Sequence, residues 1–308
     1  MYDPKHIIEL IASNVGKTGN PFGAPQSVIN TWWKGAPLRR EGDAMLFTGL
    51  MYQSLPYIQR TTAVLERHED TSRGDWVRHG RYVPAFLVGL GLRLLVSRRE
   101  KEKFNRILHD VHTVLVKSNV DFFYRPELDM YSGILLHDLG DEEGFARHAR
   151  LVAQTLKRKG IGKLITVDPH TTYALKVLYP RYTGESFQVR TYFELARIKA
   201  GNGRKRVTLH DPCFYGRYLE LADVPARVLR DLGFECVPVK NSGKFTNCCG
   251  GPAESISPGL SREVLERRLD ELKATGAPIV AMCPLCLGNL MRAGVPVEDL
   301  STLIARCA

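Results

Sequence analysis

The chain has 308 residues, of which 44% are hydrophobic and 25% charged, so it is long enough for two domains or one large α/β domain with a full apolar core. Its formal net charge is +10, but the basic residues fall in short runs without interleaved aromatic residues, and no nucleic-acid-binding signature is present. We therefore expect no nucleic-acid partner. Two explanations of the charge stay open: a solvated basic surface, and a docking face for an acidic partner protein.

The N-terminal residues contain no basic stretch followed by an apolar core, so we expect no secretory signal. Seven cysteines, an odd number, then favour thiolates held as metal ligands in a reducing compartment over a disulfide framework. No apolar run is long enough to span a bilayer, so we expect no transmembrane segment. We expect a cytoplasmic protein, and leave open its membership of a membrane-associated complex and peripheral contact with a membrane.

The first predicted elements are an N-terminal helical segment, 1–43, and a buried apolar strand, Ala44–Phe47, that is bounded by glycine turns. A helix follows, and residues 67–100 are then predicted to be a helical insertion. Within the insertion, the apolar stretch Tyr82–Val96 predicts a buried helix, with a membrane-surface or partner-docking helix as the alternative. The stretch Lys101–Lys117 has apolar residues along one face and predicts an amphipathic helix.

The second half of the chain repeats the plan of the first. The strand Lys163–Val167 meets a helix at Asp168, and the strand Ile279–Met282 meets a helix at Cys283, 115 residues later (168 to 283). Strands that alternate with helices imply mostly parallel sheets, so we predict an α/β protein built from two pseudo-symmetric α/β units. The predicted parts are an N-terminal helical segment 1–43, a first unit 44–181 with its insertion, a linker 182–206 and a second unit 207–308.

Five cysteines lie in three segments of the second unit. Cys213 follows an Asp-Pro turn, the pair Cys248-Cys249 precedes two glycines, and Cys283 and Cys286 form a Cys-Pro-Leu-Cys motif at a strand–helix junction. Thirty-four residues separate the first segment from the second, and thirty-three separate the second from the third. We expect all three to meet at the carboxyl edge of one parallel sheet, where α/β proteins place their sites.

Thiolates in the first turn of a helix are stabilised by free backbone N–H groups and by the helix dipole. Adjacent cysteines rarely bind one mononuclear ion, because their side chains diverge, but they can bind neighbouring irons of a cluster. Five soft ligands are one more than a tetrahedral zinc ion or a cubane iron–sulfur cluster uses. The number therefore indicates a larger cluster, and a structural zinc site is the alternative.

The three segments resemble the cysteine-rich CCG domain, which places Cys-Cys-Gly between an opening cysteine and Cys-x-x-Cys at similar spacings. The start of the motif, His210–Arg217, is also similar to the start of that domain. The domain occurs in the B and D subunits of heterodisulfide reductases, in the K-type subunit of sulfite-reductase-associated complexes, and in iron–sulfur subunits of glycolate, lactate and glycerol-3-phosphate oxidation systems.

The resemblance implies one noncubane [4Fe-4S] cluster. In the family such a cluster cleaves or forms a disulfide-type bond one electron at a time, where substrate sulfur meets cluster iron. Carried over residue by residue, the expected ligands are Cys213, Cys248, Cys249, Cys283 and Cys286.

Family members often carry two such domains, but the first copy in this chain is degenerate. Leu50, Tyr131-Ser132 and Asp168-Pro169-His170-Thr171 stand where its cysteines are expected, so we expect no cluster there. The sequence also contains no ferredoxin-type cysteine run. Electrons are therefore expected to come from a ferredoxin-like iron–sulfur subunit, with a flavoprotein as a further candidate partner.

Four more residues are candidates for the site, each with a purely structural role as the alternative. His170 could contact substrate from the first unit and supply a proton to a released thiol, and His210 could hydrogen-bond near the cluster. Arg217 and Lys244 could offer positive charge to an anionic thiol substrate or to the reduced cluster. Cys236, in a predicted strand, is expected to be a buried apolar residue instead.

The sequence thus predicts an oxidoreductase subunit of the heterodisulfide-reductase type that acts on thiol or disulfide sulfur, with a small or protein-borne disulfide as substrate. Two alternatives stay open. One is an electron-relay iron–sulfur subunit of a glycolate, lactate or glycerol-3-phosphate oxidation complex. The other is a non-catalytic, zinc-stabilised assembly module.

Overall fold

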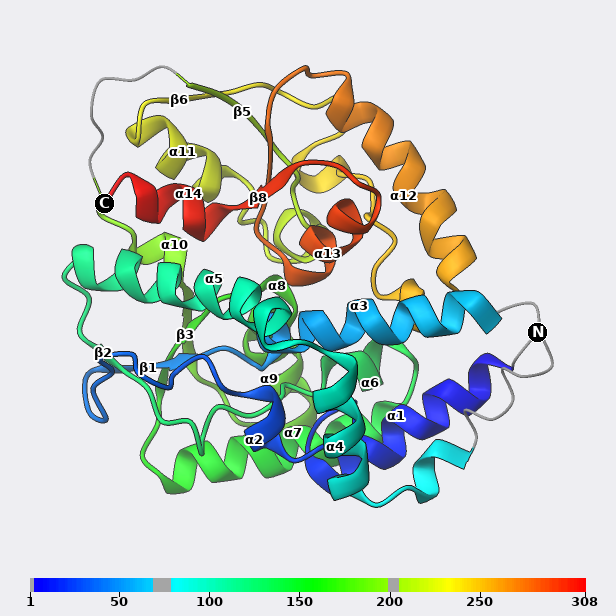
Figure 1. Ribbon diagram of the computed structural model, residues 1–308. Helices are drawn as coiled ribbons and strands as arrows, with labels where there is room; N and C mark the ends of the chain where they lie inside the picture. The colour runs from blue at the N-terminus through cyan, green and yellow to red at the C-terminus, as the bar shows by residue number, and fades with distance from the viewer. Residues whose placement is uncertain (1–2, 69–78, 199–204) are drawn as a thin grey trace.

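Two four-stranded sheets form the centre of the protein (Figure 1), whose computed structural model describes residues 3–68, 79–198 and 205–308. All described strand pairs are parallel, and the order is β2-β1-β3-β4 in one sheet and β6-β5-β7-β8 in the other. The predicted fold of two pseudo-symmetric α/β units is therefore confirmed. The strands are β1 Ala44–Phe47, β2 Phe122–Phe123, β3 Lys163–Thr166 and β4 Gln188–Thr191, then β5 Lys205–Leu209, β6 Phe234–Cys236, β7 Ile279–Ala281 and β8 Val297–Asp299.

The central strands are apolar because helices cover both faces of the sheets. Every residue of β1 is buried, and its Met45 is paired with Leu164 of β3. In the second sheet, Ile279 of β7 is paired with Thr208 of β5 on one side and with Val297 of β8 on the other. Because all strands run the same way, each unit has one edge at which the carboxyl ends of its strands meet.

The helices of the first unit begin where the chain supplies capping residues. Ser97 and Glu100 form a capping box at the start of α5, and Asp141 caps α7 by accepting from Gly144 N–H. The first-unit helices are α1 Pro4–Thr18, α2 Gln26–Ile29, α3 Met51–His68, α4 Ala85–Leu95, α5 Arg98–Lys117, α6 Ile134–Asp138, α7 Glu142–Arg158, α8 Pro169–Tyr173, the π-helix η2 Ala174–Leu178, α9 Tyr179–Thr183 and α10 Tyr192–Leu195.

The second unit has fewer and shorter helices around its sheet. The cysteine-containing segments connect to the π-helix η3 Phe214–Tyr218, the 3₁₀ turns η4 Gly243–Phe245 and η5 Ala253–Ser255, and the helix α13 Pro284–Arg292. The remaining second-unit helices are α11 Asp223–Asp231, α12 Pro258–Lys273 and α14 Leu300–Arg306.

The stretch 182–206 is not a plain linker, and this prediction was wrong. It contains β4 and α10, and β4 pairs with β3 as the fourth strand of the first sheet. Alternating burial along Gln188–Thr191 marks a strand with one face in the core. The first unit therefore continues beyond residue 181, and only the end of the predicted linker, 199–204, lies outside the described residues.

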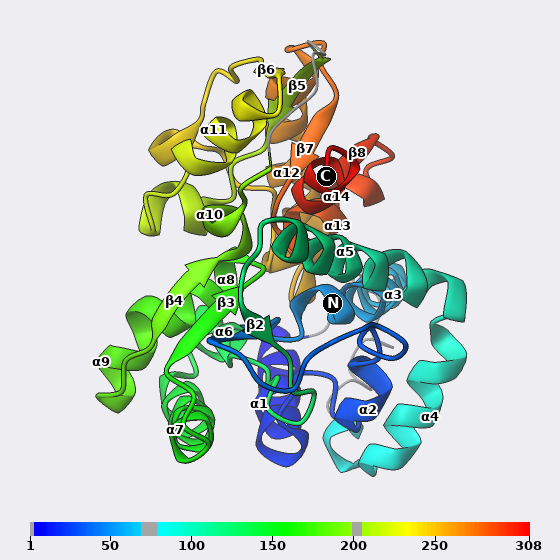
Figure 2. The same cartoon turned by 90° about the vertical axis from the view of Figure 1, so that its left-hand side faces the viewer.

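The two units are stacked, with helices of the first against helices of the second (Figure 2). Helix α3 packs against α13, and α5 packs against α14. Hydrogen bonds join the units within this buried contact: Tyr52 Oη donates to Asp299 Oδ2 at 2.6 Å, and Thr302 Oγ1 donates to Asp110 Oδ2 at 2.6 Å. Residues far apart in sequence are thus held together at the level of the two carboxyl edges.

Helix α4 corrects a second prediction. We expected Tyr82–Val96 to be a buried helix, but only one side of α4 packs inward, where Leu92 and Val96 join a small core with Val28 and Tyr57. The opposite side carries large apolar side chains that are exposed. Part of the predicted insertion, residues 69–78, lies outside the described residues. None of the described helices is both long and apolar enough to cross a membrane.

Candidate iron–sulfur site

The five cysteines of the three segments come together at the carboxyl edge of the second sheet. Cys213 follows β5 at the start of η3, and Cys248 and Cys249 lie in the loop between η4 and η5. Cys283 is the N-cap residue of α13, directly after β7, and Cys286 is in the first turn of that helix. All five are free thiols.

The thiols interact with one another in one continuous series. Cys213 interacts with Cys248, Cys248 with Cys249, Cys249 with Cys286, and Cys286 with Cys283. Cys249, Cys283 and Cys286 are buried, whereas Cys213 and Cys248 are half-buried. The group is therefore sealed on the side of α13 and open on the side of η3 and η4.

The thiols differ in their readiness to ionise. Hydrogen bonds from Cys213 and Cys249 lower the pKa of Cys248 to about 2, and the bond to Cys248 and burial raise the pKa of Cys213. Burial opposes ionisation of Cys283, but hydrogen bonding by Cys286 and the charge of His170 hold the pKa of Cys283 well below its ordinary value. A compact group of thiols with a strong preference for some thiolate character suits soft, positively charged metal centres.

Glycine allows the vicinal cysteine pair to approach the rest of the site. Gly250 has a φ of +86°, and a Cβ at this residue would lie 2.3 Å from the carbonyl oxygen of Ser261. Its N–H donates to Cys248 Sγ at 3.3 Å. Asn289 of α13 fixes the other side of the loop, since its Nδ2 donates to the Cys249 carbonyl oxygen at 3.0 Å.

His170 reaches the thiols from the first unit. It lies on α8, is buried, and hydrogen-bonds with Cys283. Its Nδ1 is 3.9 Å from Asp138 Oδ2 and has no hydrogen-bond partner among the described residues. Burial opposes protonation, but the thiolate of Cys283 and the carboxylates of Asp138 and Asp168 raise the pKa of His170 to about 9. The ring also stacks against Phe214, with the centroids 4.6 Å apart.

His210 approaches the thiols from the second unit. One of its ring nitrogens lies within 4.8 Å of the sulfurs of Cys249 and Cys286. Nδ1 accepts a hydrogen bond from Arg268 Nε at 2.9 Å, so the ring proton is on Nε2, which is buried without a partner among the described residues. Burial and the neighbouring guanidinium of Arg268 lower the pKa of His210 to about 3. The ring is therefore a neutral N–H donor next to the sulfurs.

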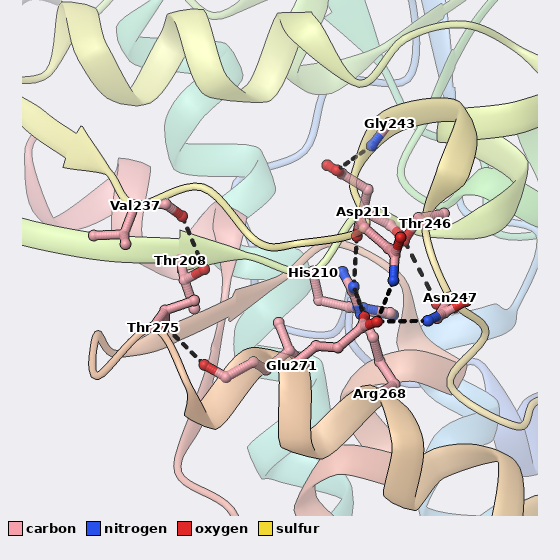
Figure 3. A network of polar contacts seen from close by, with 12 residues as sticks. Thr208, His210, Asp211, Val237, Gly243, Thr246, Asn247, Arg268, Glu271 and Thr275 are labelled. Atoms are coloured by element: carbon pink, nitrogen blue, oxygen red, sulfur yellow. Dashed lines mark hydrogen bonds and ion pairs between the residues drawn. The ribbon is translucent and has the colours of Figure 1, made fainter.

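Arg268 is a residue that the sequence reasoning missed (Figure 3). Its side chain is 0% exposed, and Nη1 donates to the Asn241 carbonyl oxygen at 2.7 Å and to Glu271 Oε2 at 2.8 Å. In Figure 3 the guanidinium lies between His210 and Glu271, so it orients the imidazole and is itself held by a carboxylate. One feature of the sequence could have pointed to it: Arg268 is a charged residue on the apolar face of α12, which also carries Leu265 and Leu272.

Glu254 is the second residue that was missed. It is buried in η5, its Oε2 has no hydrogen-bond partner among the described residues, and burial raises its pKa to about 7. It lines a cavity of about 10 Å³ between α3 and α13, roughly the room of one water molecule. The sequence carries no signal for it, because Glu254 stands in an irregular loop with no periodic pattern.

Arg217 and Lys244 lie on the open side of the site but are engaged elsewhere. Arg217 Nη2 donates to the Thr246 carbonyl oxygen at 2.8 Å, which fixes the loop that leads to Cys248. Lys244 pairs with Glu220 at 2.7 Å on the surface. Among the contacts of the described residues, neither Arg217 nor Lys244 touches a cysteine sulfur. The role of these two residues in substrate binding therefore stays a prediction. Cys236, at the end of β6, is half-buried and bonds to the Ala226 carbonyl oxygen at 3.9 Å.

Comparison with known proteins identifies the second unit. Residues 207–291 match the family model of the cysteine-rich domain, CCG, which covers all five clustered cysteines. Over these residues the second unit is therefore similar to the cysteine-rich domain. The predicted resemblance is thereby confirmed, and the cysteine-rich domain coincides with the unit whose sheet edge carries the thiols.

Parts of this chain are similar to a ferredoxin, a heterodisulfide reductase subunit and a quinone oxidoreductase. One is a probable membrane-anchored ferredoxin of Chromohalobacter salexigens, 32% identical over 216 residues, which are 65% of this chain and 32% of the relative. The D subunit of the dihydromethanophenazine:CoB–CoM heterodisulfide reductase of Methanosarcina mazei is 33% identical over 177 residues, 51% of this chain and 43% of the relative. An EtfAB:quinone oxidoreductase of Syntrophomonas wolfei is 27% identical over 204 residues, which are 60% of this chain and 28% of the relative. The chain spans less than half the length of each.

The residues of the cysteine-rich domain fit an iron–sulfur cluster by their own chemistry. Five free thiols lie in one partly buried group, which is more sulfur than one tetrahedral zinc ion uses. Donors to sulfur surround the group: the N–H of Gly250 and the ring of His170. Hydrogen bonds to cluster sulfur are one of the means by which proteins set a reduction potential.

Proposed function

We propose that the protein is an iron–sulfur redox subunit of the heterodisulfide-reductase type. It cleaves or forms a disulfide-type bond at one noncubane [4Fe-4S] cluster, and it exchanges electrons with a partner iron–sulfur subunit. The proposed ligands are Cys213, Cys248, Cys249, Cys283 and Cys286. The observation that carries the proposal is the unbroken chain of five thiols, which a four-ligand zinc site does not require.

The bound cluster would supply single electrons and an iron atom to which a substrate sulfur can bind. Reduction of one disulfide consumes two electrons and two protons and yields two thiols. His170 is the residue proposed to supply a proton, because its imidazole is buried at the group and hydrogen-bonds with Cys283 from the neighbouring unit. His210, held by Arg268, is proposed to present its Nε2–H to the sulfurs and to position them.

Substrate and electrons are proposed to reach the site from the side of Cys213 and Cys248, because these two thiols are only half-buried. Tyr218 of η3 and Phe245 of η4 are exposed on this side, and Tyr218 stacks against Phe214 beside His170. Exposed aromatic residues next to a half-buried redox group are suited to contact a partner or an organic disulfide.

Metal analysis after anaerobic purification tests the cofactor. We expect about four iron and about four acid-labile sulfide per chain for a single [4Fe-4S] cluster. One zinc per chain without sulfide would reject the redox proposal in favour of the zinc-stabilised assembly module. A Cys236→Ser variant is the matched control, since this cysteine lies outside the thiol chain and its loss should leave the iron content unchanged.

Electron relay is the second candidate function, favoured by the similarity to a ferredoxin and to a quinone oxidoreductase. Electron paramagnetic resonance of the oxidised protein separates the two. With a panel of small thiols that includes dithiothreitol, direct sulfur chemistry should produce a paramagnetic signal that depends on the thiol added. A cluster that is reduced and reoxidised normally, but whose spectrum no thiol changes, would favour relay.

A further inference from the structure

Helix α4 carries an exposed apolar face on the outside of the first unit. Phe86, Leu90 and Leu94 are 68%, 54% and 83% exposed. They recur at intervals of four residues and so form one ridge along the helix. Burial of such side chains is favourable, and a contiguous apolar surface of this kind marks a site of association.

The other face of α4 shows that the helix is firmly placed and not a loose segment. Gly89 lies against Pro25, to which a Cβ at this residue would approach within 3.0 Å. Leu92 and Val96 are buried with Val28 and Tyr57. The exposed ridge is therefore presented outward by a helix that is anchored along its opposite side.

The charged residues closest to the ridge in sequence are basic. Residues 79–99 contain no aspartate or glutamate. Arg93 on α4 and Arg98 and Arg99 at the start of α5 have no ion pair recorded among the described residues, and the two α5 arginines line a surface hollow with Lys103. Two glutamates also line this hollow: Glu100, which is paired with Arg60, and Glu102.

We propose that α4 docks on an anionic membrane surface, lying in the plane of the interface. Phe86, Leu90 and Leu94 would insert between acyl chains, and Arg93, Arg98 and Arg99 would contact lipid phosphates. The helix has 11 residues and so a length of about 16 Å, far short of the ~30 Å hydrocarbon core, which fits an in-plane helix and not a span.

The shape and chemistry of the ridge favour a bilayer over a protein partner. In Figure 2, α4 lies at the periphery of the molecule, at the far end of the first unit from β5 and β6. A protruding row of leucine and phenylalanine with basic residues in excess beside it is the pattern of interfacial helices. The centre of a protein interface is instead depleted of charge and rich in tyrosine, tryptophan and methionine.

Vesicle flotation of the intact, anaerobically purified protein tests the inference. We expect binding to vesicles of phosphatidylcholine with phosphatidylglycerol, and much weaker binding to phosphatidylcholine alone. The double variant Leu90→Gln/Leu94→Gln should bind the anionic vesicles at least tenfold more weakly. Removal of one arginine, in Arg98→Ser or Arg99→Ser, should weaken binding about fivefold.

The control is Leu151→Gln, which removes from α7 a leucine about as exposed as Leu90 and should leave vesicle binding unchanged. Since all these side chains are exposed, far-ultraviolet circular dichroism should be unchanged in every variant. No binding of the unaltered protein to anionic vesicles overturns the proposal, as does binding that the leucine substitutions do not weaken. Failure to bind vesicles together with loss of a co-purifying subunit in the leucine variant would instead assign α4 to a protein interface.

Depth of insertion gives a second, independent measurement. A Phe86→Trp variant, read as the difference from the unaltered protein, should show a blue-shifted emission with anionic vesicles and quenching by lipids brominated on their acyl chains. An emission from the introduced indole that neither shifts nor is quenched overturns insertion, even if the protein binds the vesicles by charge.

Discussion

The two α/β units have the same strand order and equivalent turns but opposite chemistry at their carboxyl edges. Gly133 and Gly250 both have a left-handed backbone, with φ of +83° and +86°. Asp168 and Cys283 are both extended N-cap residues directly before a helix, with φ of −139° and −136°. The backbone that brings the thiols together in the second unit is thus also built in the first, which has none of those thiols.

The first unit fills the same edge with hydrogen bonds. The buried carboxylate of Asp129 accepts from Thr48 N at 2.7 Å, Thr48 Oγ1 at 2.6 Å, Gly49 N at 3.3 Å and Tyr124 Oη at 2.7 Å. A buried carboxylate needs hydrogen-bond donors, and Thr48, Gly49 and Tyr124 supply four donor groups to Asp129. The comparison teaches that the fold supplies the position of the edge, whereas a few side chains decide whether it binds a cofactor or closes on itself.

The sharpest way to break this comparison is to remove one thiol. Cys249→Ser interrupts the chain of thiols at the vicinal pair, and we expect it to lose most of its iron and sulfide. The measurement is the iron and sulfide content per chain, with Cys236→Ser as the control. A Cys249→Ser protein that keeps a full cluster would show that five ligands is the wrong number.

The next largest effect is expected on the stability of the protein when Arg268 is replaced. Among the contacts described for the edge of the first unit, no residue has an equivalent role. Arg268→Leu leaves Glu271, the Asn241 carbonyl and His210 Nδ1 without their shared donor, so the free energy of unfolding should fall by about 3–5 kcal/mol. The exposed neighbour Arg267→Leu is the control and should change it by less than about 0.5 kcal/mol.

A second measurement separates positioning by Arg268 from mere stability. The reduction potential of the cluster should shift in Arg268→Leu, because His210 would no longer be held with Nε2–H toward the sulfurs. Stability lost without any change of potential would leave Arg268 a structural residue only.

His170 is the residue through which the first unit contributes to the chemistry of the second. His170→Gln should keep its iron and sulfide but reduce a disulfide at least tenfold more slowly, since a positioned proton donor is lost. The control is His148→Gln, a buried first-unit histidine that is bonded to the Tyr131 carbonyl oxygen and not to a cysteine. An unchanged rate in His170→Gln would confine the chemistry to the second unit.

The smallest expected effect tests the closed edge of the first unit. Burial raises the pKa of Asp129 to about 6 in the folded protein, above its ordinary value of 3.8. The proton that folding retains stabilises the protein below pH 3.8, and this stabilisation is lost as the pH rises through 6. Between about pH 5 and 7 the unaltered protein should therefore lose about 1 kcal/mol that an Asp129→Asn variant does not lose. Urea unfolding of both proteins at several pH values measures it, and parallel curves would contradict the assignment.

Much of the fold was readable because its signals are local. Continuous apolar runs such as Ala44–Phe47, capping residues such as Asp141, and the regular alternation of strand and helix are properties of short stretches. The strand inside the predicted linker was missed because its local signal is weak. The strand Gln188–Thr191 is short, and only two of its residues face the core. The prediction that Tyr82–Val96 is a buried helix was wrong for a related reason. An apolar sequence predicts a helix, but it does not predict how much of the surface of that helix is covered by other elements.

By itself, the sequence determined the thiol group: strand patterns place Cys213 and Cys283 after the neighbouring parallel strands β5 and β7, and the glycines beside Cys249 allow close approach. Only the tertiary structure decided what surrounds it. His170, Arg268 and Glu254 come from other elements, and no spacing along the chain encodes their distance from a sulfur. Ligand order follows from connectivity, whereas neighbours across an interface follow from packing, which is a property of the whole molecule.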